Sequence, residues 1–262
     1  MFRGNSTGKR VTKEKYAGAW YASGGSRGRE FYTIMHLPYT SMVLSYVLIG
    51  AMLAPTIHLD RLNLTLLAYF LGLGFSAHAL NELHVAHWTE NLGKNELTAL
   101  FLVPFVGALA IGAYGVTDLF AVCGSIFPPL ILMTLILVEI FFLFAYNIDA
   151  FNGRFHSDVA FAFSWAALPT LVSYYVNALT ITTGALLVAL AMAATAEIEI
   201  NLSRWCKELR RRSPLNELRF ANGTRQTMNT PEFTARPEKA LKLIVIVVDM
   251  LAISLIAFRL LP

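Results

Sequence analysis

Long apolar runs separated by short polar stretches dominate this chain. Each run holds at least about 18 residues, and roughly 20 helical residues cross a hydrocarbon core of about 30 Å. Backbone groups inside lipid must be hydrogen-bonded within their own segment, so the runs predict helices even where valine and isoleucine are frequent. The fold class that follows is an all-α polytopic membrane bundle of about seven transmembrane helices. The predicted spans are 41–59, 63–82, 97–115, 119–146, 157–177, 180–200 and 240–260.

The composition agrees with this pattern. The chain has 262 residues, of which 56% are hydrophobic and only 15% are charged. A soluble domain of this size does not carry so much apolar surface, so we expect a multi-pass protein of the cell membrane. Its expected partners are membrane lipids and a lipophilic substrate, with homo- or hetero-oligomers left open. The net charge of +4 is explained by contact with anionic lipid, and no nucleic-acid partner is expected.

The basic residues predict an orientation. In the predicted topology, all of the 21 lysines and arginines except Arg61 and Arg259 fall on one side of the membrane. Lysine and arginine accumulate in cytoplasmic loops. The sequence therefore places the N-terminus in the cytoplasm and the C-terminus outside.

Four regions follow from the same pattern. Residues 1–30 are basic and rich in glycine and serine, which predicts a disordered cytoplasmic tail. Residues 31–200 form a six-helix membrane core. Residues 201–239 begin with a predicted amphipathic helix, with Trp205 at headgroup depth, and continue as a proline-containing cytoplasmic loop. Residues 240–262 form the last transmembrane helix.

A dense polar cluster closes the second predicted span. His78 and Glu82 are four residues apart, so on a helix both could reach one metal ion. Asn81 shares their face, whereas His84 and His87 point elsewhere unless the helix has already ended. The cluster predicts a ligand or metal site at the membrane interface. The alternative is a polar helix end solvated by lipid headgroups and water.

A second polar cluster follows the fourth span, where Tyr146, Asn147 and Arg154 crowd one short connection. Arg154 is its only cation and could bind an anion. A well-capped loop is the alternative interpretation.

A third cluster closes the sixth span, where Glu197 shares a helix face with Asn201 and Glu199 lies on another face. These acids could bind a divalent ion, or they could pair with the basic helix that follows. Glu139 and Asp249 lie deeper in their spans and must face the bundle, for which a hydrogen bond to a neighbouring helix is the commoner explanation.

Taken together, these features resemble the UbiA superfamily of intramembrane prenyltransferases. The resemblance runs from His36 to Asn201, and it depends on the order and spacing of the elements. Its residues are the segment 35–42 before the first span, Asn81 and Glu82 at the end of the second, Tyr146 and Arg154 after the fourth, the fifth span 161–175, and Glu197 and Glu199 at the end of the sixth.

The resemblance implies a site for an isoprenoid diphosphate and a lipophilic acceptor on the cytoplasmic side. In that family, two acidic motifs hold Mg²⁺, which neutralises the leaving diphosphate. Carried over to this chain, the catalytic residues would be Glu82, Glu197 and Glu199. The substrate-binding residues would be Asn81, Tyr146, Asn147, Arg154 and Asn201, and the metal ligands His78, Glu82, His84, His87 and Glu199.

Two other functions are compatible with the same residues. Val85 and Thr89 stand where the family's first motif has further aspartates, and histidine favours a transition metal over Mg²⁺. The chain could therefore be a metal-binding or proton-transferring protein on a UbiA-like scaffold. It could also be a non-catalytic membrane subunit or lipid-binding protein.

Overall fold

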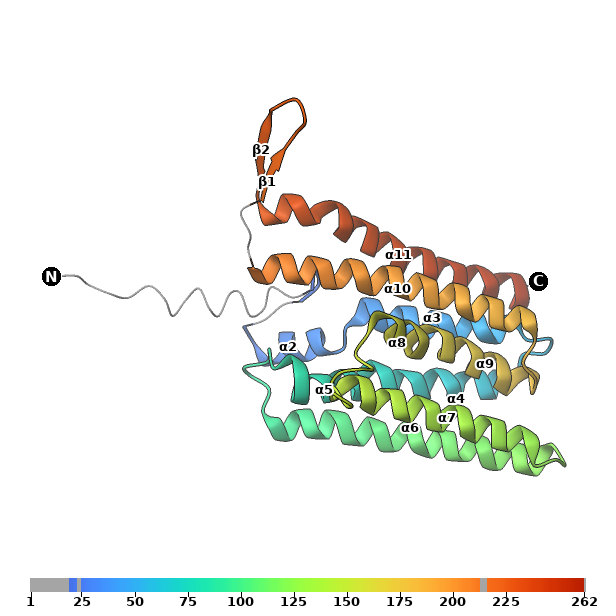
Figure 1. The fold of residues 1–262 in the computed structure, drawn as a ribbon. Helices are drawn as coiled ribbons and strands as arrows, with labels where there is room; N and C mark the ends of the chain where they lie inside the picture. Colours follow the sequence, from blue (N-terminus) through green and yellow to red (C-terminus); the bar gives the residue numbers. More distant parts are fainter. Residues whose placement is uncertain (1–18, 23–24, 213–215, 262) are drawn as a thin grey trace.

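The computed structural model describes residues 19–22, 25–212 and 216–261, and in them the chain is almost entirely helical (Figure 1). Seven helices are long and apolar enough to cross a membrane, which confirms the predicted fold class. They are Arg27–Leu53, Leu59–Ala86, Lys94–Val122, Phe127–Asn147, Asp158–Ala178, Thr183–Arg212 and Thr230–Leu260.

Several of these spans are interrupted. The first contains α2 (Arg27–Ile34) and α3 (Leu37–Leu53). The second contains α4 (Leu59–Tyr69), the π-helix η1 (Phe70–Ala77), α5 (His78–Asn81) and the π-helix η2 (Glu82–Ala86). The fifth contains α8 (Asp158–Ala162), the π-helix η3 (Phe163–Ala167) and α9 (Leu168–Ala178). The uninterrupted helices are α6 (Lys94–Val122), α7 (Phe127–Asn147), α10 (Thr183–Arg212) and α11 (Thr230–Leu260).

The two ends of the bundle differ. The short connections 54–58, 123–126 and 179–182 lie at one end, called here the short-loop end, together with the C-terminus (Figure 1). The longer connections 87–93 and 148–157 and the segment between α10 and α11 lie at the other, called here the long-loop end.

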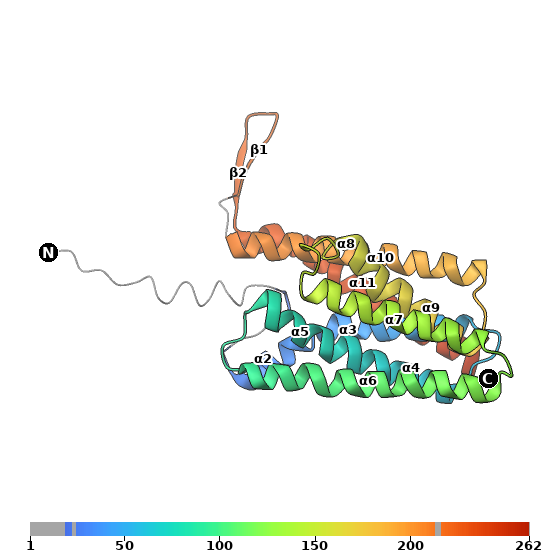
Figure 2. The same cartoon turned by 60° about the horizontal axis from the view of Figure 1, so that its bottom comes forward.

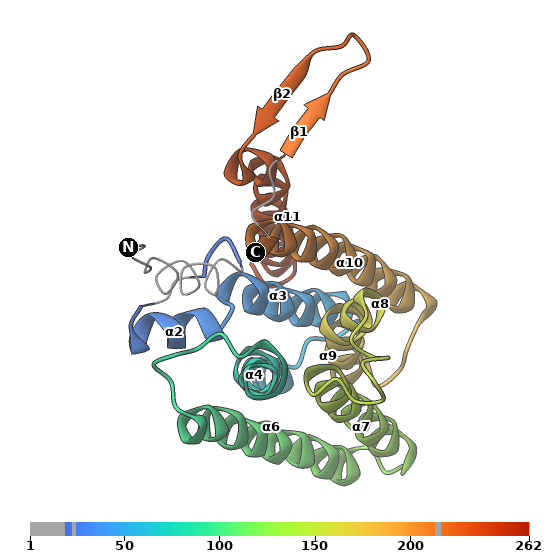
Figure 3. The ribbon, with the colours of Figure 1, turned by 60° about the vertical axis from the view of Figure 1, so that its left-hand side comes forward.

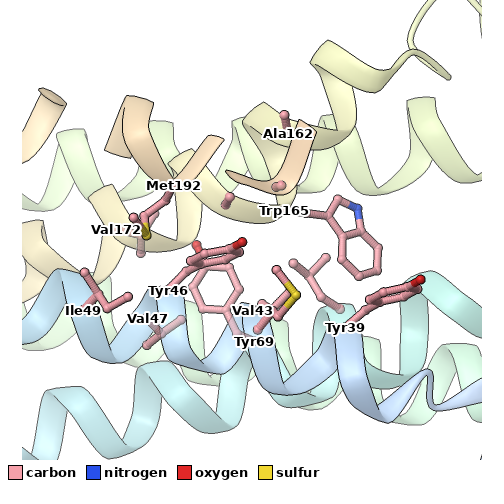
Figure 4. Packing of buried hydrophobic residues seen from close by; sticks show 14 of the residues in the cluster. Tyr39, Val43, Tyr46, Val47, Ile49, Tyr69, Ala162, Trp165, Val172 and Met192 are labelled. Carbon is pink, nitrogen blue, oxygen red and sulfur yellow. The ribbon is translucent and has the colours of Figure 1, made fainter. Parts of the chain in front are cut away.

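The core of the bundle lies around α3 and α9. In their membrane-spanning windows 61% and 78% of the residues are buried, against 6% for α6 and 17% each for α7 and α11. Figure 3 shows α4 surrounded by its neighbours rather than at the periphery. The largest buried side chains include Tyr46 and Tyr175. In Figure 4, Tyr39 and Trp165 lie at one end of this core, and Ile49 and Val172 at the other.

The turn between α6 and α7 lies later in the chain than the sequence predicts. The predicted third span ends at residue 115, but α6 continues to Val122, and α7 begins at Phe127. Pro128 and Pro129 occupy the first turn of α7, where a missing backbone N–H costs little. Gly124 supplies the left-handed backbone, with φ of 58°, that the turn requires.

The segment after residue 200 also differs from its prediction. α10 runs unbroken to Arg212, so the predicted interfacial helix is the last part of a membrane-spanning one. An antiparallel hairpin of β1 (Asn216–Arg219) and β2 (Arg225–Met228) then projects away from the bundle (Figures 1 and 2). α11 begins at Thr230, within the predicted loop, because Asn229 and Glu232 form a capping box.

α2 begins at Arg27, inside the range 1–30 that the sequence predicts as a tail, and residues 1–18 of that range lie outside the described residues. Glu30 on α2 is fully buried and accepts the backbone N–H groups of Glu90, Asn91 and Leu92. Such charge-assisted bonds are among the stronger hydrogen bonds in proteins. Glu30 therefore fixes the connection 87–93 against the first helix.

Candidate functional site

A group of polar and aromatic side chains is packed inside the long-loop end of the bundle. We call it the histidine cluster. Its members come from the segment before α2, from α3 and the residue before it, and from α5, η3 and α10. They are Tyr21, His36, Tyr39, His78, Trp165, Glu199 and Lys207.

Two imidazole rings form the centre of the cluster. The ring centroids of His36 and His78 are 4.2 Å apart, and the Trp165 ring lies 4.9 Å beyond His78. The Tyr21 hydroxyl is hydrogen-bonded to His36 Nδ1. Burial raises the pKa of the Tyr21 hydroxyl well above its ordinary value of 10.0, with Tyr39 and Glu199 adding to the shift. Tyr21 therefore keeps its proton at neutral pH and can donate it to the imidazole.

A buried carboxyl and an ammonium group complete the cluster. The Glu199 side chain is only 2% exposed, and it is hydrogen-bonded to Tyr39, whose hydroxyl also lies 2.9 Å from Ser203 Oγ. Lys207, two turns further along α10, interacts electrostatically with Glu199, His36 and His78. Attraction between a carboxylate and an ammonium lowers the cost of burying either charge.

Two polar atoms of the cluster lack a hydrogen-bond partner in the described part of the chain. Among the described residues, neither Glu199 Oε1 nor His78 Nε2 has a hydrogen-bond partner, although both atoms are shielded from solvent. Leaving a buried polar atom unpaired costs about 1–3 kcal/mol. Such atoms in a native structure call for an explanation, and a ligand or a proton-transfer role is one.

Irregular backbone produces this arrangement. The π-helix η1 ends directly before His78, and Trp165 lies within the π-helix η3. A π-helical turn inserts an extra residue into a helix and so changes the direction of the side chains around it, and such turns are frequent at functional sites. His36 itself has left-handed backbone with φ of 43°, which is uncommon for a residue other than glycine. The left-handed residue His36 and the π-helices η1 and η3 therefore all adjoin the histidine cluster.

Of the predicted site residues, the structure brings His78 and Glu199 into this cluster and leaves others outside it. The Glu82 carboxyl accepts the backbone N–H and the hydroxyl of Thr89, both at 2.7 Å, and so closes the turn after η2. His84 and His87 are exposed, and His87 has left-handed backbone where η2 ends. Glu197 is exposed on the outer side of α10.

The predicted substrate-binding residues are also dispersed. Asn147 and Asn201 each donate a side-chain hydrogen bond to a carbonyl four residues earlier on their own helix, and Arg154 is exposed. Asn81 is half-buried on α5. The Tyr146 hydroxyl accepts a hydrogen bond at 3.1 Å from Arg204, which lies on α10 between Glu199 and Lys207 of the cluster. The Arg204 guanidinium also pairs with Asp158 at 2.6 Å.

The acidic residues do not fit the magnesium site that the resemblance implies. Thr89 engages Glu82 through Oε1 and leaves Oε2 buried without a hydrogen-bond partner among the described residues, but Glu197 faces outward, and the three acids do not converge. Across residues 19–22, 25–212 and 216–261, no three His, Cys, Asp or Glu side chains come together in a way that could hold a metal ion. Mg²⁺ and a transition metal thus stay predictions from the sequence alone.

Five members of the cluster were not predicted as site residues: Tyr21, His36, Tyr39, Trp165 and Lys207. His36 and Tyr39 lie in the segment 35–42 on which the resemblance depends, which was the one available signal for them. Tyr21 and Lys207 lie in basic stretches that indicate a membrane surface. Their part in the cluster depends on packing between distant segments.

The chain matches no protein-family model, no curated protein and no solved structure. Its seven apolar helices define a multi-pass membrane protein. The resemblance to the UbiA superfamily remains a prediction from the sequence.

Proposed function

We propose that this membrane protein binds a lipophilic molecule with an aromatic, hydrogen-bonding head, such as a phenol or a quinone, at the histidine cluster. The observation that carries the proposal is the pair of unpartnered atoms, Glu199 Oε1 and His78 Nε2, buried beside Lys207. A carboxylate accepts a hydrogen bond from a hydroxyl, and an imidazole N–H or an ammonium donates to a carbonyl. The cluster therefore offers an acceptor for the hydroxyl of a phenol and donors for the carbonyl of a quinone.

The aromatic surroundings support the same ligand class. Trp165 stacks on Phe161 with ring centroids 5.1 Å apart and an interplanar angle of 16°. Tyr21 and Tyr39 pack edge to face at 5.4 Å on the other side of the imidazoles. A ring-shaped head would add to these aromatic contacts, which contribute about 0.5–1.5 kcal/mol per pair beyond simple burial.

The position of the cluster near the end of the helices supports a ligand whose tail stays in lipid. The head would lie close to the membrane surface, where proton exchange with water is possible. His36, His78 and Glu199 are residue types that transfer protons in enzymes, so acid–base chemistry on the bound head is within the reach of this site.

Prenyl transfer from an isoprenoid diphosphate is a second candidate, and the basic residues of α10 favour it. Lys207 interacts electrostatically with Arg204 and Arg211, which gives the long-loop end a concentration of positive charge suited to a diphosphate. In this version the phenol or quinone would be the lipophilic acceptor. No step is assigned to a metal ion, since the acidic residues do not converge.

The test is a fluorescence titration of the purified protein in lipid nanodiscs with a short-tailed ubiquinone, whose ring quenches nearby tryptophan emission. We expect saturable quenching that Trp165→Phe reduces, with Trp20, whose ring lies 5.2 Å from that of Tyr21, as the source of the remainder. Glu199→Gln should weaken binding by about tenfold, the equivalent of one net hydrogen bond. Glu197→Gln is the matched control, two residues away on the exposed side of the same helix, and should bind as the wild type does.

Equal affinities for Glu199→Gln and Glu197→Gln, or quenching that Trp165→Phe leaves unchanged, would refute the proposal. Release of diphosphate from farnesyl diphosphate with a phenolic acceptor, measured with and without EDTA, tests the second candidate. Release that depends on Lys207 would support prenyl transfer, and an absence of release from the folded wild type would rule it out under those conditions.

A further inference from the structure

An apolar cavity of about 160 Å³, lined by none of the residues of the histidine cluster, lies between the helices. Residues of α4, η1, α6, α7 and α9 line it. Small residues line it: Ala68 of α4 and Gly72 of η1 on one side, and Ala108, Gly112 and Gly115 of α6 on the other. Gly72 faces Ala108, whereas Gly112 and Gly115 face Ile136 and Leu132 of α7. Interiors of proteins are normally packed without such space, so a row of small residues that leaves it open requires an explanation.

The charged groups that line the cavity toward the short-loop end are paired with one another and with the backbone. Arg61 pairs with Asp118 at 3.3 Å and donates a second hydrogen bond at 3.0 Å to the backbone carbonyl of Val176. These groups satisfy one another, so they do not call for a ligand.

Glu139, by contrast, lines the cavity with hydrogen-bonding positions that remain unused. Tyr69 donates a hydrogen bond at 2.6 Å to Glu139 Oε1, and no other hydrogen bond to this carboxyl occurs in the described part of the chain. At 1.5 Å per residue, Glu139 lies about 18 Å from the start of α7, which is the middle of a membrane. A carboxyl has about four acceptor positions, or a donor when protonated, and an apolar surrounding leaves them unused at a cost.

We propose that this cavity binds a single-chain lipophilic alcohol, with its hydroxyl on the Glu139–Tyr69 pair and its chain along the small residues of α4 and α6. A hydroxyl donates one hydrogen bond and accepts others, so it pairs with the carboxyl in either protonation state. The chain needs the slot that Ala68, Gly72 and Ala108 leave open. The cavity shares no residue with the histidine cluster.

The bilayer is the source of this ligand. α6 and α7, which form one wall of the cavity, are among the least buried helices, with 6% and 17% of their windows buried inside the protein. A lipid-soluble alcohol can therefore approach between them without passing through water, where its chain would be poorly solvated.

The test compares dodecanol with dodecane at equal mole fraction in nanodiscs, with bound ligand counted by native mass spectrometry. We expect the wild type to bind dodecanol about tenfold better than dodecane, as one net hydrogen bond allows. Ala108→Leu should abolish binding of both by filling the slot. Ala110→Leu is the matched control, because Ala110 lies on the exposed side of α6 and outside the cavity.

Glu139→Met tests the polar contact separately. It keeps a side chain of similar length, and we expect the preference for the alcohol to disappear while dodecane binding is retained. Equal binding of the two ligands by the wild type, or equal loss in Ala108→Leu and Ala110→Leu, would overturn the proposal. These two comparisons remain decisive if Glu139→Met does not fold. Glu199→Gln should leave dodecanol binding unchanged, so the two sites are tested independently.

Discussion

At the scale of single residues, the glycine with least room for a side chain, among those described, is Gly50. A Cβ atom built on Gly50 of α3 would lie 2.1 Å from the backbone carbonyl oxygen of Thr170 on α9. Backbone atoms of a packed helix cannot move aside as a side chain can, so only glycine is compatible with this approach. Small residues at such interfaces let membrane helices pack by dispersion forces.

Gly50→Ala should therefore destabilise the protein by about 3 kcal/mol, the upper part of the usual range for overpacking. Unfolding of the reconstituted protein by a denaturing detergent, followed by circular dichroism, measures this. Gly28→Ala is the control, because nothing lies within 4 Å of the added atom, and the better helix propensity of alanine should add about 0.5–1 kcal/mol. Similar effects of both changes would show that the α3–α9 contact is not tight.

The sequence indicated part of the site at this scale and missed the rest for a physical reason. His78 and Glu199 were predicted because each ends an apolar span with polar side chains, where burial is costly without a purpose. Tyr21 and Lys207 lie in basic stretches, Lys207 on the polar side of a predicted amphipathic helix, and their roles appear only when α10 packs beside the residues that precede α3. Contacts between segments so distant in the chain cannot be derived from spacing.

At the scale of elements, the sequence predicts which segments are helices, but not where a helix becomes π-helical. Apolar length alone gives all seven spans, because lipid leaves the backbone no alternative. The π-helices η1 and η3 have no comparable signature, since they depend on how neighbouring helices pack. They change the directions of His78 and Trp165, so a helical wheel with regular spacing could not place these rings together.

The hairpin β1–β2 stands apart from the helices it connects. Residues 217–227 are exposed and Met228 is half-buried, and two-stranded hairpins are marginally stable on their own. Contacts nearer the membrane hold α10 to α11 without it, namely the ion pair Arg210–Glu238 and the ring contact of Trp205 with Phe233 at 5.2 Å. The hairpin is therefore an appendage of the bundle and not a support for it.

Replacing residues 216–228 by a glycine–serine linker of equal length should change the unfolding free energy by less than about 0.5 kcal/mol, as for other surface changes. Phe233→Ala, which removes the ring contact between the two helices, should cost more. Thermal unfolding of both variants in the same lipid measures this. A large loss of stability in the linker variant would mean that the hairpin packs against part of the assembly.

At the scale of the whole molecule, the two ends of the bundle carry different charge. Arg61 and Arg259, the two basic residues predicted to lie opposite all the others, are both at the short-loop end, where they donate to the carbonyls of Val176 and Ala54. The remaining lysines and arginines of the described chain lie toward the long-loop end or in its connections. The positive-inside rule therefore predicts that the long-loop end faces the cytoplasm.

Labelling of single cysteines in intact cells tests this orientation. In a background with Cys123→Ala and Cys206→Ala, we introduce Thr224→Cys in the hairpin or Ser125→Cys in the α6–α7 turn, both at exposed positions. A membrane-impermeant maleimide should label only the Ser125→Cys protein until the cells are opened. The reverse pattern would put the histidine cluster on the outer side of the membrane.

The central place of α3 and α9 has a consequence for biogenesis. The two helices that form the core are the first and the fifth to leave the ribosome, and α4, α6 and α7 are made between them. The tight seam at Gly50 therefore cannot close until about two thirds of the chain has been synthesised. Until then the face of α3 that carries Thr40 and Ser45, both buried in the finished bundle, has no α9 to pack against.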